Sequence, residues 1–278
     1  MPELPEVETV RRGLVQRVAG RLITDVSVGR PRSVRRTSAA ELVARTRDTR
    51  IESVDRRGKY IVARLDSGDG LMVHLRMSGQ LLVDRVDSPR PAHTHVVFEL
   101  DGRDELRFVD PRTFGEVVAF DPDHADRVVP ELARLGVDPV VDDLELPELR
   151  RLLRSTRRPV KAMLLDQSLI AGIGNIYGDE ILHRAGVDPR RPAAEVNAAQ
   201  SKRLHRSIAE VLGEAIAAGG STLGDAQYVD LMGEGGSYQD QHRVYGRAGS
   251  RCVTCARGVV VAASIGGRTS SWCRVCQR

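Results

Sequence analysis

The chain has 278 residues, of which 41% are hydrophobic and 29% charged, a globular composition with enough residues for about two domains. No apolar run approaches the roughly eighteen residues that a bilayer span requires, so we expect neither a transmembrane nor a disordered protein. The N-terminus carries Glu3, Glu6 and Glu8 where a signal peptide needs a cationic start and an apolar run. We therefore expect a cytoplasmic protein.

The net charge of +4 hides an uneven distribution. Residues 241–278 contain seven arginines and no aspartate, glutamate or lysine, which leaves 35 of the 42 basic residues and all 38 acidic residues in the first 240. All four cysteines lie in the same tail. A basic, cysteine-bearing tail on a nearly neutral body indicates an anionic partner.

The first half begins with a helix and continues as strands. Apolar residues at helical spacing follow Pro2, and Gly20 is suited to ending that helix. Short β-rich runs broken by turn residues follow, and they predict an antiparallel sandwich or barrel. The expected strands are 61–65, 71–75, 95–100, 106–109 and 116–120.

The second half is predicted to be helical. Residues 135–147 are acidic and punctuated by proline, as in a linker between domains. Residues 219–249 are rich in Gly, Asp and Gln with weak periodicity, which predicts a loop. The expected helices between these segments are 146–153, 160–165, 178–185 and 194–218.

The cysteines have the spacing of a four-thiolate zinc site, because two C-x2-C pairs are separated by seventeen residues. Two disulfides or a redox pair are the alternatives, and a cytoplasmic chain disfavours the first. Four cysteines leave no open coordination position, so one zinc ion would be structural. The spacer predicts a β-hairpin with Arg268 near its tip. The expected ligands are Cys252, Cys255, Cys273 and Cys276.

Residues 150–161 carry six positive charges and no acidic residue. A solvated basic helix face is the common explanation of such a run, but together with the basic tail it favours a nucleic-acid partner. A glycine-rich turn follows, in which Gly172, Gly174 and Asn175 could hold a phosphate at a helix start.

Several motifs occur in an order typical of one family. They are MPELPEVETVRRGL, RRGKY, HLRMSGQL, DPRTFG, LLDQSLIAGIGNIYGDEIL, VYGR and the four-cysteine tail. In them the chain resembles the bacterial formamidopyrimidine-DNA glycosylases of base-excision repair. The resemblance implies an α+β fold: a helix with an antiparallel β-sandwich in 1–134, the linker 135–147, a helix-two-turn-helix domain with a damaged-base loop in 148–246, and a zinc finger in 247–278.

The resemblance also implies a bifunctional DNA glycosylase and apurinic/apyrimidinic lyase for oxidised purines. Its nucleophile would be the amine of Pro2 after removal of Met1, and Glu3 would be its acid/base carboxylate, with Glu6 in support. A helix-starting proline and a favourable first-turn charge are the structural explanations of Pro2 and Glu3. Lys59 would donate a proton and contact phosphate, and Arg268 would hold the phosphates around the lesion during the second elimination.

A base taken out of the stack leaves a void. By the resemblance, Met77, Arg112 and Phe114 fill this void, whereas the structural alternative makes Met77 and Phe114 core residues of strands. The remaining expected DNA contacts are His74, His93, Arg112, Arg157, Asn175 and Tyr245.

The expected damaged-base loop, 221–245, departs from the common family pattern and is longer. Two other functions stay open: an endonuclease VIII-type glycosylase for oxidised pyrimidines, and a non-catalytic zinc-dependent DNA-binding protein. Leu4 and the complete DPRTFG motif favour the first-named family over the endonuclease VIII type. We expect a monomer that acts on damaged double-stranded DNA, without membrane contact, in the bacterial cytoplasm at the nucleoid.

Overall fold

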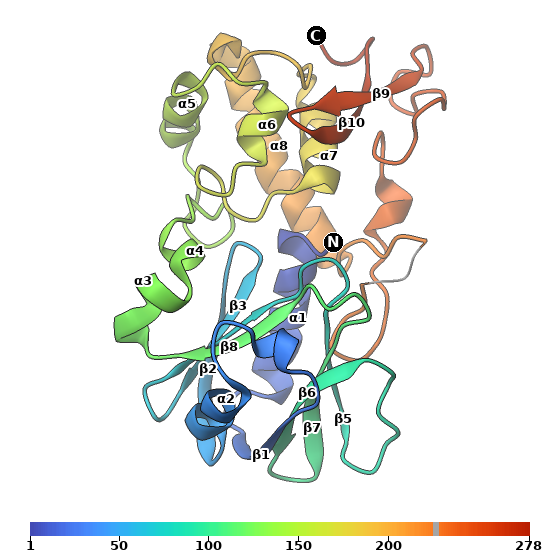
Figure 1. Ribbon diagram of the computed structural model, residues 1–278. Coiled ribbons are helices and arrows are strands. Elements are labelled where there is room, and N and C mark those ends of the chain that lie inside the picture. The colour runs from blue at the N-terminus through green and yellow to red at the C-terminus, as the bar shows by residue number, and fades with distance from the viewer. Residues whose placement is uncertain (225–227) are drawn as a thin grey trace. The chain divides into compact units, whose positions relative to one another are not determined.

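The computed structural model describes residues 1–224 and 228–278 (Figure 1). The chain forms two compact units. Unit 1 comprises Met1–Ala133 and Ala218–Gln239, and unit 2 comprises Arg134–Ala217 and Asp240–Arg278. The chain therefore leaves unit 1 once, returns to it for about twenty residues, and ends in unit 2.

Unit 1 begins with helix α1, Leu4–Arg17. Glu3 is its N-cap, and Pro5 lies in the first turn, where a missing N–H costs nothing. Val7, Val10 and Leu14 share one face of the helix and are buried in the core of the unit. The predicted opening helix is confirmed.

Eight antiparallel strands follow, in the order β5-β7-β6-β1-β2-β3-β4-β8. Strands β1 and β2 share two residue pairs in register, so they join two larger halves of the sheet at a narrow seam. Side chains from both halves and from α1 form one core. The first domain therefore consists of a helix and antiparallel strands, as predicted. The strands are β1 Leu22–Val28, β2 Thr49–Arg57, β3 Tyr60–Leu65, β4 Gly70–His74, β5 Gln80–Arg85, β6 Thr94–Leu100, β7 Asp104–Val109 and β8 Glu116–Phe120.

A helix that the sequence analysis did not predict, α2 (Ala39–Thr46), lies between β1 and β2. Ser38 caps it, since its Oγ accepts the N–H of Glu41 at 3.0 Å. Short helical turns complete this part of the chain. They are η1 Pro31–Val34, η2 Pro122–His124, α3 Ala125–Val128 and α4 Pro130–Ala133.

The returning segment of unit 1 packs into the same core. Tyr228 and Leu231 are buried, and Leu231 O accepts the N–H of Val83 at 3.0 Å. A Cβ on Gly13 would lie 3.1 Å from Leu231 Cβ, so this face of α1 is closely covered. Residues 225–227 of the expected damaged-base loop lie outside the described residues.

Unit 2 contains the predicted hairpin and helices, except that the helix expected over 194–218 begins only at Ala198, after the short turn η3. Asn197 Oδ1 accepts the N–H of Gln200 at 2.9 Å and so caps the helix there. Helix α8 packs against α7 and α5, and α7 packs against β10. The hairpin pairs Arg268 with Ile265 around a two-glycine turn, as expected. The elements are α5 Leu146–Arg154, α6 Val160–Leu164, α7 Asn175–Ala185, η3 Ala193–Glu195, α8 Ala198–Ala217, β9 Val260–Ile265 and β10 Arg268–Cys273; η4, Tyr238–Gln241, spans the boundary between the units.

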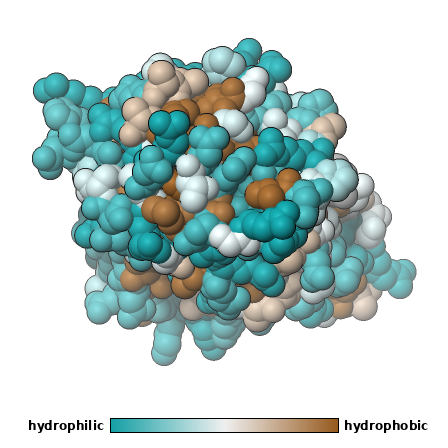
Figure 2. Space-filling view, turned by 90° about the horizontal axis from the view of Figure 1, so that it is seen from below, coloured by the Kyte–Doolittle hydropathy of each residue, from teal (hydrophilic) through white to brown (hydrophobic). Residues whose placement is uncertain are grey.

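The surface shown in Figure 2 is covered mostly by hydrophilic residues, with hydrophobic ones in small separate patches. Among the described residues, no helix combines the length and the apolar character needed to cross a membrane.

Candidate active site and DNA-contacting surface

The first turn of α1 holds the expected nucleophile and carboxylate. Pro2, Glu3 and Glu6 are all buried. The N–H of Glu3 donates to Glu6 Oε2 at 2.8 Å, and Glu6 Oε1 accepts the N–H of Ser221 at 2.7 Å. A Cβ on Gly220 would lie 2.7 Å from Glu6 Oε1, and its φ of +81° favours glycine. Glu6 therefore fixes both the residue after Pro2 and the start of the expected damaged-base loop.

The turn that carries Lys59 is tied to the same helix. Arg56, whose side chain is fully buried, donates from Nε to Glu8 Oε2 at 3.0 Å and from Nη1 to the carbonyl of Gly58 at 2.9 Å. Lys59 itself is 7% exposed. One guanidinium thus connects the helix that follows Pro2 to the hairpin turn that carries the expected proton donor.

Glu8 is ionised in this arrangement. Burial would raise its pKa, but hydrogen bonds from Arg11, Arg12 and Arg56 outweigh burial and lower the pKa to about 2. A permanently charged Glu8 keeps Arg56 in place over the physiological pH range.

His74 lies at the end of β4, beside the Lys59 turn. Burial, and then the positive charge of Arg76, lower its pKa to about 3, so the ring is neutral at pH 7. Its Nδ1 accepts the N–H of Arg76 at 3.0 Å, which places the proton on Nε2. Tyr60 packs edge-on against the ring, with centroids 4.4 Å apart. His74 can therefore offer a neutral hydrogen bond from a fixed orientation.

The three expected void-filling residues lie on loops of unit 1, not in strands. Met77 is 38% exposed and Phe114 is 43% exposed, so the alternative that both are core residues is wrong. The guanidinium carbon of Arg112 lies 5.2 Å from the centroid of the Phe114 ring. An adaptable thioether, an aromatic ring and a guanidinium thus stand at the surface of one unit.

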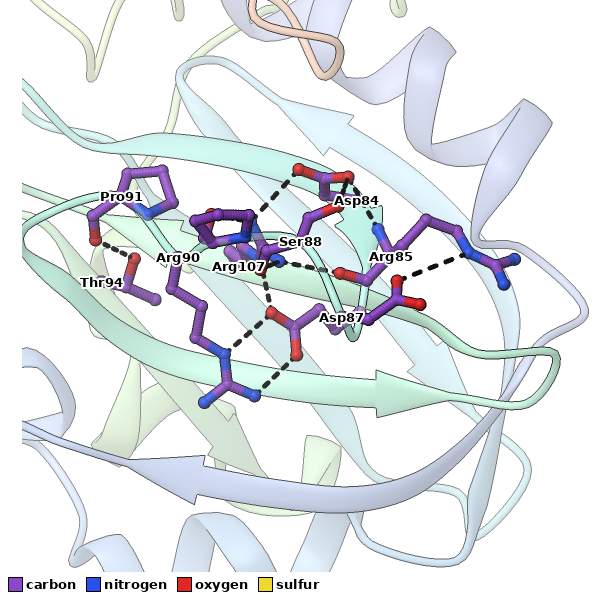
Figure 3. A network of polar contacts seen from close by, with 10 residues as sticks. Asp84, Arg85, Asp87, Ser88, Arg90, Pro91, Thr94 and Arg107 are labelled. Atoms are coloured by element: carbon purple, nitrogen blue, oxygen red, sulfur yellow. Dashed lines mark hydrogen bonds and ion pairs between the residues drawn. The ribbon is translucent and has the colours of Figure 1, made fainter.

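The loop between β5 and β6 wraps around Arg107 (Figure 3). His93 is the last residue of this loop, directly before β6. Arg107 is buried, and its Nη2 donates to the carbonyls of Arg85 and Ser88, both at 2.9 Å. Arg90 reaches back from the loop to Glu105, which also accepts from Arg107. The buried guanidinium gives an otherwise irregular loop one conformation and leaves His93 exposed at its end.

In unit 2, Asn175 begins α7 and contacts the hairpin. Its Nδ2 donates to the carbonyl of Thr269 at 2.8 Å, and Lys161 Nζ donates to the carbonyl of Asn175 at 2.7 Å. A Cβ on Gly266, whose φ is +57°, would lie 2.8 Å from Ala162 Cβ, so the hairpin tip packs against α6. Arg268 is exposed at this anchored tip.

Tyr245 is positioned by α7 as well. Glu180, buried in that helix, accepts three consecutive backbone N–H groups, those of Arg243, Val244 and Tyr245, at 2.8 to 3.0 Å. Arg157 is exposed in the turn between α5 and α6. Unit 2 thus carries Arg157, Asn175, Tyr245 and Arg268, and unit 1 carries the other expected contacts together with Pro2, Glu3 and Lys59, the other expected catalytic residues.

The four cysteines form a cluster that can hold a metal ion, with all sulfur atoms within 4.8 Å of one another. The Cys252–Cys276 and Cys255–Cys273 sulfur pairs are both 3.8 Å apart. This separation is too long for a disulfide, and it matches the edge of about 3.8 Å of a tetrahedron with metal–sulfur bonds of about 2.3 Å. All four cysteines are free in the structure, so it does not contain the two disulfides of the alternative interpretation.

The sequence analysis did not single out the buried groups that orient these residues: Arg56, Arg107 and Glu180. Each lies in a quoted motif or in a predicted strand or helix, but the sequence around a charged residue seldom shows that its side chain is buried. The one available signal is a charged residue on an otherwise apolar face, as for Glu180 among the buried residues of α7.

The chain matches known proteins over its whole length. Residues 1–117 match the formamidopyrimidine-DNA glycosylase N-terminal domain, and residues 135–227 match the formamidopyrimidine-DNA glycosylase H2TH domain. The chain is 44% identical over 281 residues to a formamidopyrimidine-DNA glycosylase of Parasynechococcus marenigrum, and the similarity covers all of both chains.

Solved structures of the Lactococcus lactis enzyme Fpg have the same fold. A mutant in complex with Fapy-dG containing DNA is 34% identical, with a TM-score of 0.90 and all of both chains covered. The wild-type enzyme in complex with oxidised pyrimidine containing DNA is 33% identical, with a TM-score of 0.88 and the same coverage. The chain therefore belongs to the formamidopyrimidine-DNA glycosylase family.

Proposed function

We propose that this chain excises oxidised purines, such as 8-oxoguanine and formamidopyrimidines, from duplex DNA and then cleaves the strand at the abasic site. Family membership makes it a DNA glycosylase of base-excision repair and implies the lyase activity. The relative that was solved with Fapy-dG containing DNA supports the purine substrate. We propose that the enzyme acts as a monomer in the cytoplasm, where its DNA substrate lies.

The nucleophile in this proposal is the secondary amine of Pro2, which becomes the free N-terminus when Met1 is removed. An α-amino group titrates near about 8, so a useful fraction is neutral at pH 7. The amine attacks C1′ of the deoxyribose, the damaged base departs, and an iminium ion forms. Glu3 moves protons as the sugar ring opens. The observation that carries the proposal is that Pro2 is buried directly before the N-cap Glu3. The Glu6 carboxylate accepts the N–H of Glu3 and so fixes the backbone next to Pro2.

The iminium ion makes the proton on C2′ acidic, so elimination of the 3′ phosphate follows, and a second elimination releases the 5′ phosphate. Lys59 suits proton transfer, because its turn is tied to α1 through Arg56. Arg268 suits phosphate binding, since a guanidinium remains protonated and offers several donors.

Binding of the distorted duplex uses the exposed side chains of both units. Met77, Arg112 and Phe114 fill the space left by the extruded base, where the guanidinium can hydrogen-bond to the orphaned partner base. A neutral His74 donates its Nε2 proton to a phosphate oxygen. The other proposed phosphate and DNA contacts are His93, Arg157, Asn175 and Tyr245.

Zinc is the metal we propose for the four-cysteine cluster. Four thiolates in tetrahedral reach suit Zn²⁺ and leave no position for water or substrate, so the ion would stabilise the hairpin and take no part in the reaction.

Borohydride trapping tests the proposed nucleophile. Zinc-replete protein should form a covalent adduct with a duplex containing 8-oxoguanine opposite cytosine, and Pro2→Gly should abolish the adduct. Pro122→Gly, which changes an exposed proline of unit 1, is the matched control and should still be trapped. A wild-type protein that binds this duplex without adduct or strand cleavage would support the non-catalytic zinc-dependent binding protein instead.

The same assay with thymine glycol separates purine from pyrimidine substrates. The relative in complex with oxidised pyrimidine containing DNA makes this comparison necessary. We expect faster trapping with 8-oxoguanine, and the reverse order would favour the endonuclease VIII-type function.

A further inference from the structure

We propose that Asp110 is a positioning residue that holds the loops of Met77, His93 and Arg112 in one arrangement for filling the void beside an extruded base. The inference rests on the proposed function and names a residue that acts through these side chains, without contacting DNA itself.

The carboxylate of Asp110 connects two loops. It is fully buried, and its Oδ1 accepts the hydroxyl of Ser78 at 2.6 Å and the N–H of Arg112 at 3.2 Å. Its Oδ2 accepts the N–H of Gly115 at 2.7 Å. Ser78 follows Met77, and Gly115 follows Phe114, so one carboxylate joins the segments that present both exposed apolar side chains.

The backbone of Asp110 adds a third segment. Its N–H donates to the carbonyl of His93 at 3.0 Å. Its carbonyl accepts Nε2 of His95 at 2.9 Å, which requires the proton on that nitrogen. The buried His95 thus anchors the end of the loop that carries His93.

Backbone strain marks the same three segments. Arg76, His93 and Thr113 have φ values of +53°, +66° and +56°, in the left-handed region that residues with a Cβ seldom adopt. Each is, or directly precedes, a proposed DNA contact. Such conformations persist where surrounding contacts enforce them. Asp110 bonds directly to His93 and Thr113, and to Ser78, two residues after Arg76.

Two of the donors to the carboxylate are backbone N–H groups, so an amide cannot satisfy both of its sides. In Asp110→Asn, a nitrogen at the Oδ2 position leaves the N–H of Gly115 without its acceptor. A nitrogen at the Oδ1 position forces the Ser78 hydroxyl to turn and accept, and it leaves the N–H of Arg112 only the 3.3 Å contact with Ser78 Oγ. The substitution keeps the volume of the side chain and removes a contact that positions a void-filling loop.

The test compares two substrates within each variant. The first is a duplex with 8-oxoguanine opposite cytosine, which requires void filling. The second is a single strand with a preformed abasic site, which has no orphaned base. Asp110→Asn should slow duplex excision by roughly tenfold, the scale of one lost hydrogen bond, and leave trapping on the single strand within about twofold. Asp101→Asn, which breaks an ion pair with Arg21 in the same unit, is the matched control and should change neither.

The preference for one base opposite the lesion is a second readout, and it should not change if Asp110 only stabilises the fold. In Asp110→Asn, the ratio of excision opposite cytosine to excision opposite adenine should fall, because Arg112 is no longer held. Ser78→Ala should give a smaller change in the same direction. A parallel loss on both substrates with an unchanged ratio would make Asp110 merely structural, and unchanged duplex excision would also overturn the inference. Failure of the wild type to be trapped on either substrate would instead overturn the proposed function.

Discussion

The two units hold their proposed DNA contacts by different means. In unit 1, the loops rise from a large sheet core, and buried carboxylates fix them by accepting backbone N–H groups. In unit 2, Glu180 does the same for Tyr245, but the hairpin that carries Arg268 has a core of only a few side chains around the cysteines. A small core supplies little hydrophobic stabilisation, so we expect the hairpin to depend on the metal ion proposed for its cysteines, whereas the sheet has a large core of its own.

Removal of the zinc ion that we propose should have the largest effect on the difference between the two units. Cys255→Ser, or removal of the ion by a chelator, should unfold the hairpin, because binding of a structural zinc ion contributes roughly 10 kcal/mol or more. Trp272, the single tryptophan of the chain, is buried in β10, so its fluorescence should shift to longer wavelength. Hydrogen exchange in α1 and the sheet should not change.

Ser264→Ala, at an exposed position of β9, is the control for that experiment and should retain zinc and the tryptophan signal. Cooperative loss of exchange protection in unit 1 as well would contradict the separation of the two cores.

The ion pair beneath the hairpin should have the next largest effect. Lys161 Nζ lies 2.6 Å from Asp179 Oδ1, both side chains are fully buried, and Asp179 Oδ2 accepts the N–H of Ser271 in β10. Lys161→Met leaves an unpaired buried carboxylate and should cost about 3–5 kcal/mol in the free energy of unfolding. The double variant Lys161→Met/Asp179→Asn should recover part of that loss in denaturant titrations.

The pH dependence gives a second check on this pair. Burial already raises the pKa of Asp179 to about 6, and loss of Lys161 should raise it further. A raised carboxylate pKa means that the folded state binds more protons than the unfolded state, so stability falls as the pH rises. The variant should therefore be more stable at pH 5 than at pH 8, and an equal loss at both would contradict a buried charge.

The sequence could predict what depends on local pattern. The spacing of Val7, Val10 and Leu14 indicated α1, and the cysteine spacing indicated a four-thiolate cluster. Helix α2 also has a local signal, because Ser38 and Glu41 are the ends of a capping-box pattern, and it is the one helix of more than one turn in unit 1 that the sequence analysis missed among the described residues. The resemblance supplied the candidate DNA contacts, and the exposure of Met77 and Phe114 removes the alternative that they form the core.

What the sequence could not predict are the groups that orient those contacts. Asp179 accepts the N–H of Ser271, 92 residues later, and Glu6 accepts that of Ser221, 215 residues later. No periodicity links residues at such separations, because the pairing depends on how the elements pack. Burial of a carboxylate among backbone donors becomes visible only in three dimensions.

The smallest expected effect is on acid stability in unit 1. Glu8 and Glu116 are both buried with arginines that lower the pKa of each to about 2, below the usual value of 4.5. A depressed pKa contributes stability that is fully present above pH 4.5 and is lost as the pH falls toward 2. Glu8→Gln should lower the free energy of unfolding by about 1–3 kcal/mol at pH 7, the range for hydrogen bonds to charged groups, and make its decline in acid less steep.

Glu148→Gln, whose carboxylate pairs with Arg151 at the exposed surface of unit 2, is the control and should change stability by less than about 1 kcal/mol. If the two variants behaved alike in acid, the burial that distinguishes the carboxylates of unit 1 from surface pairs would have no energetic consequence.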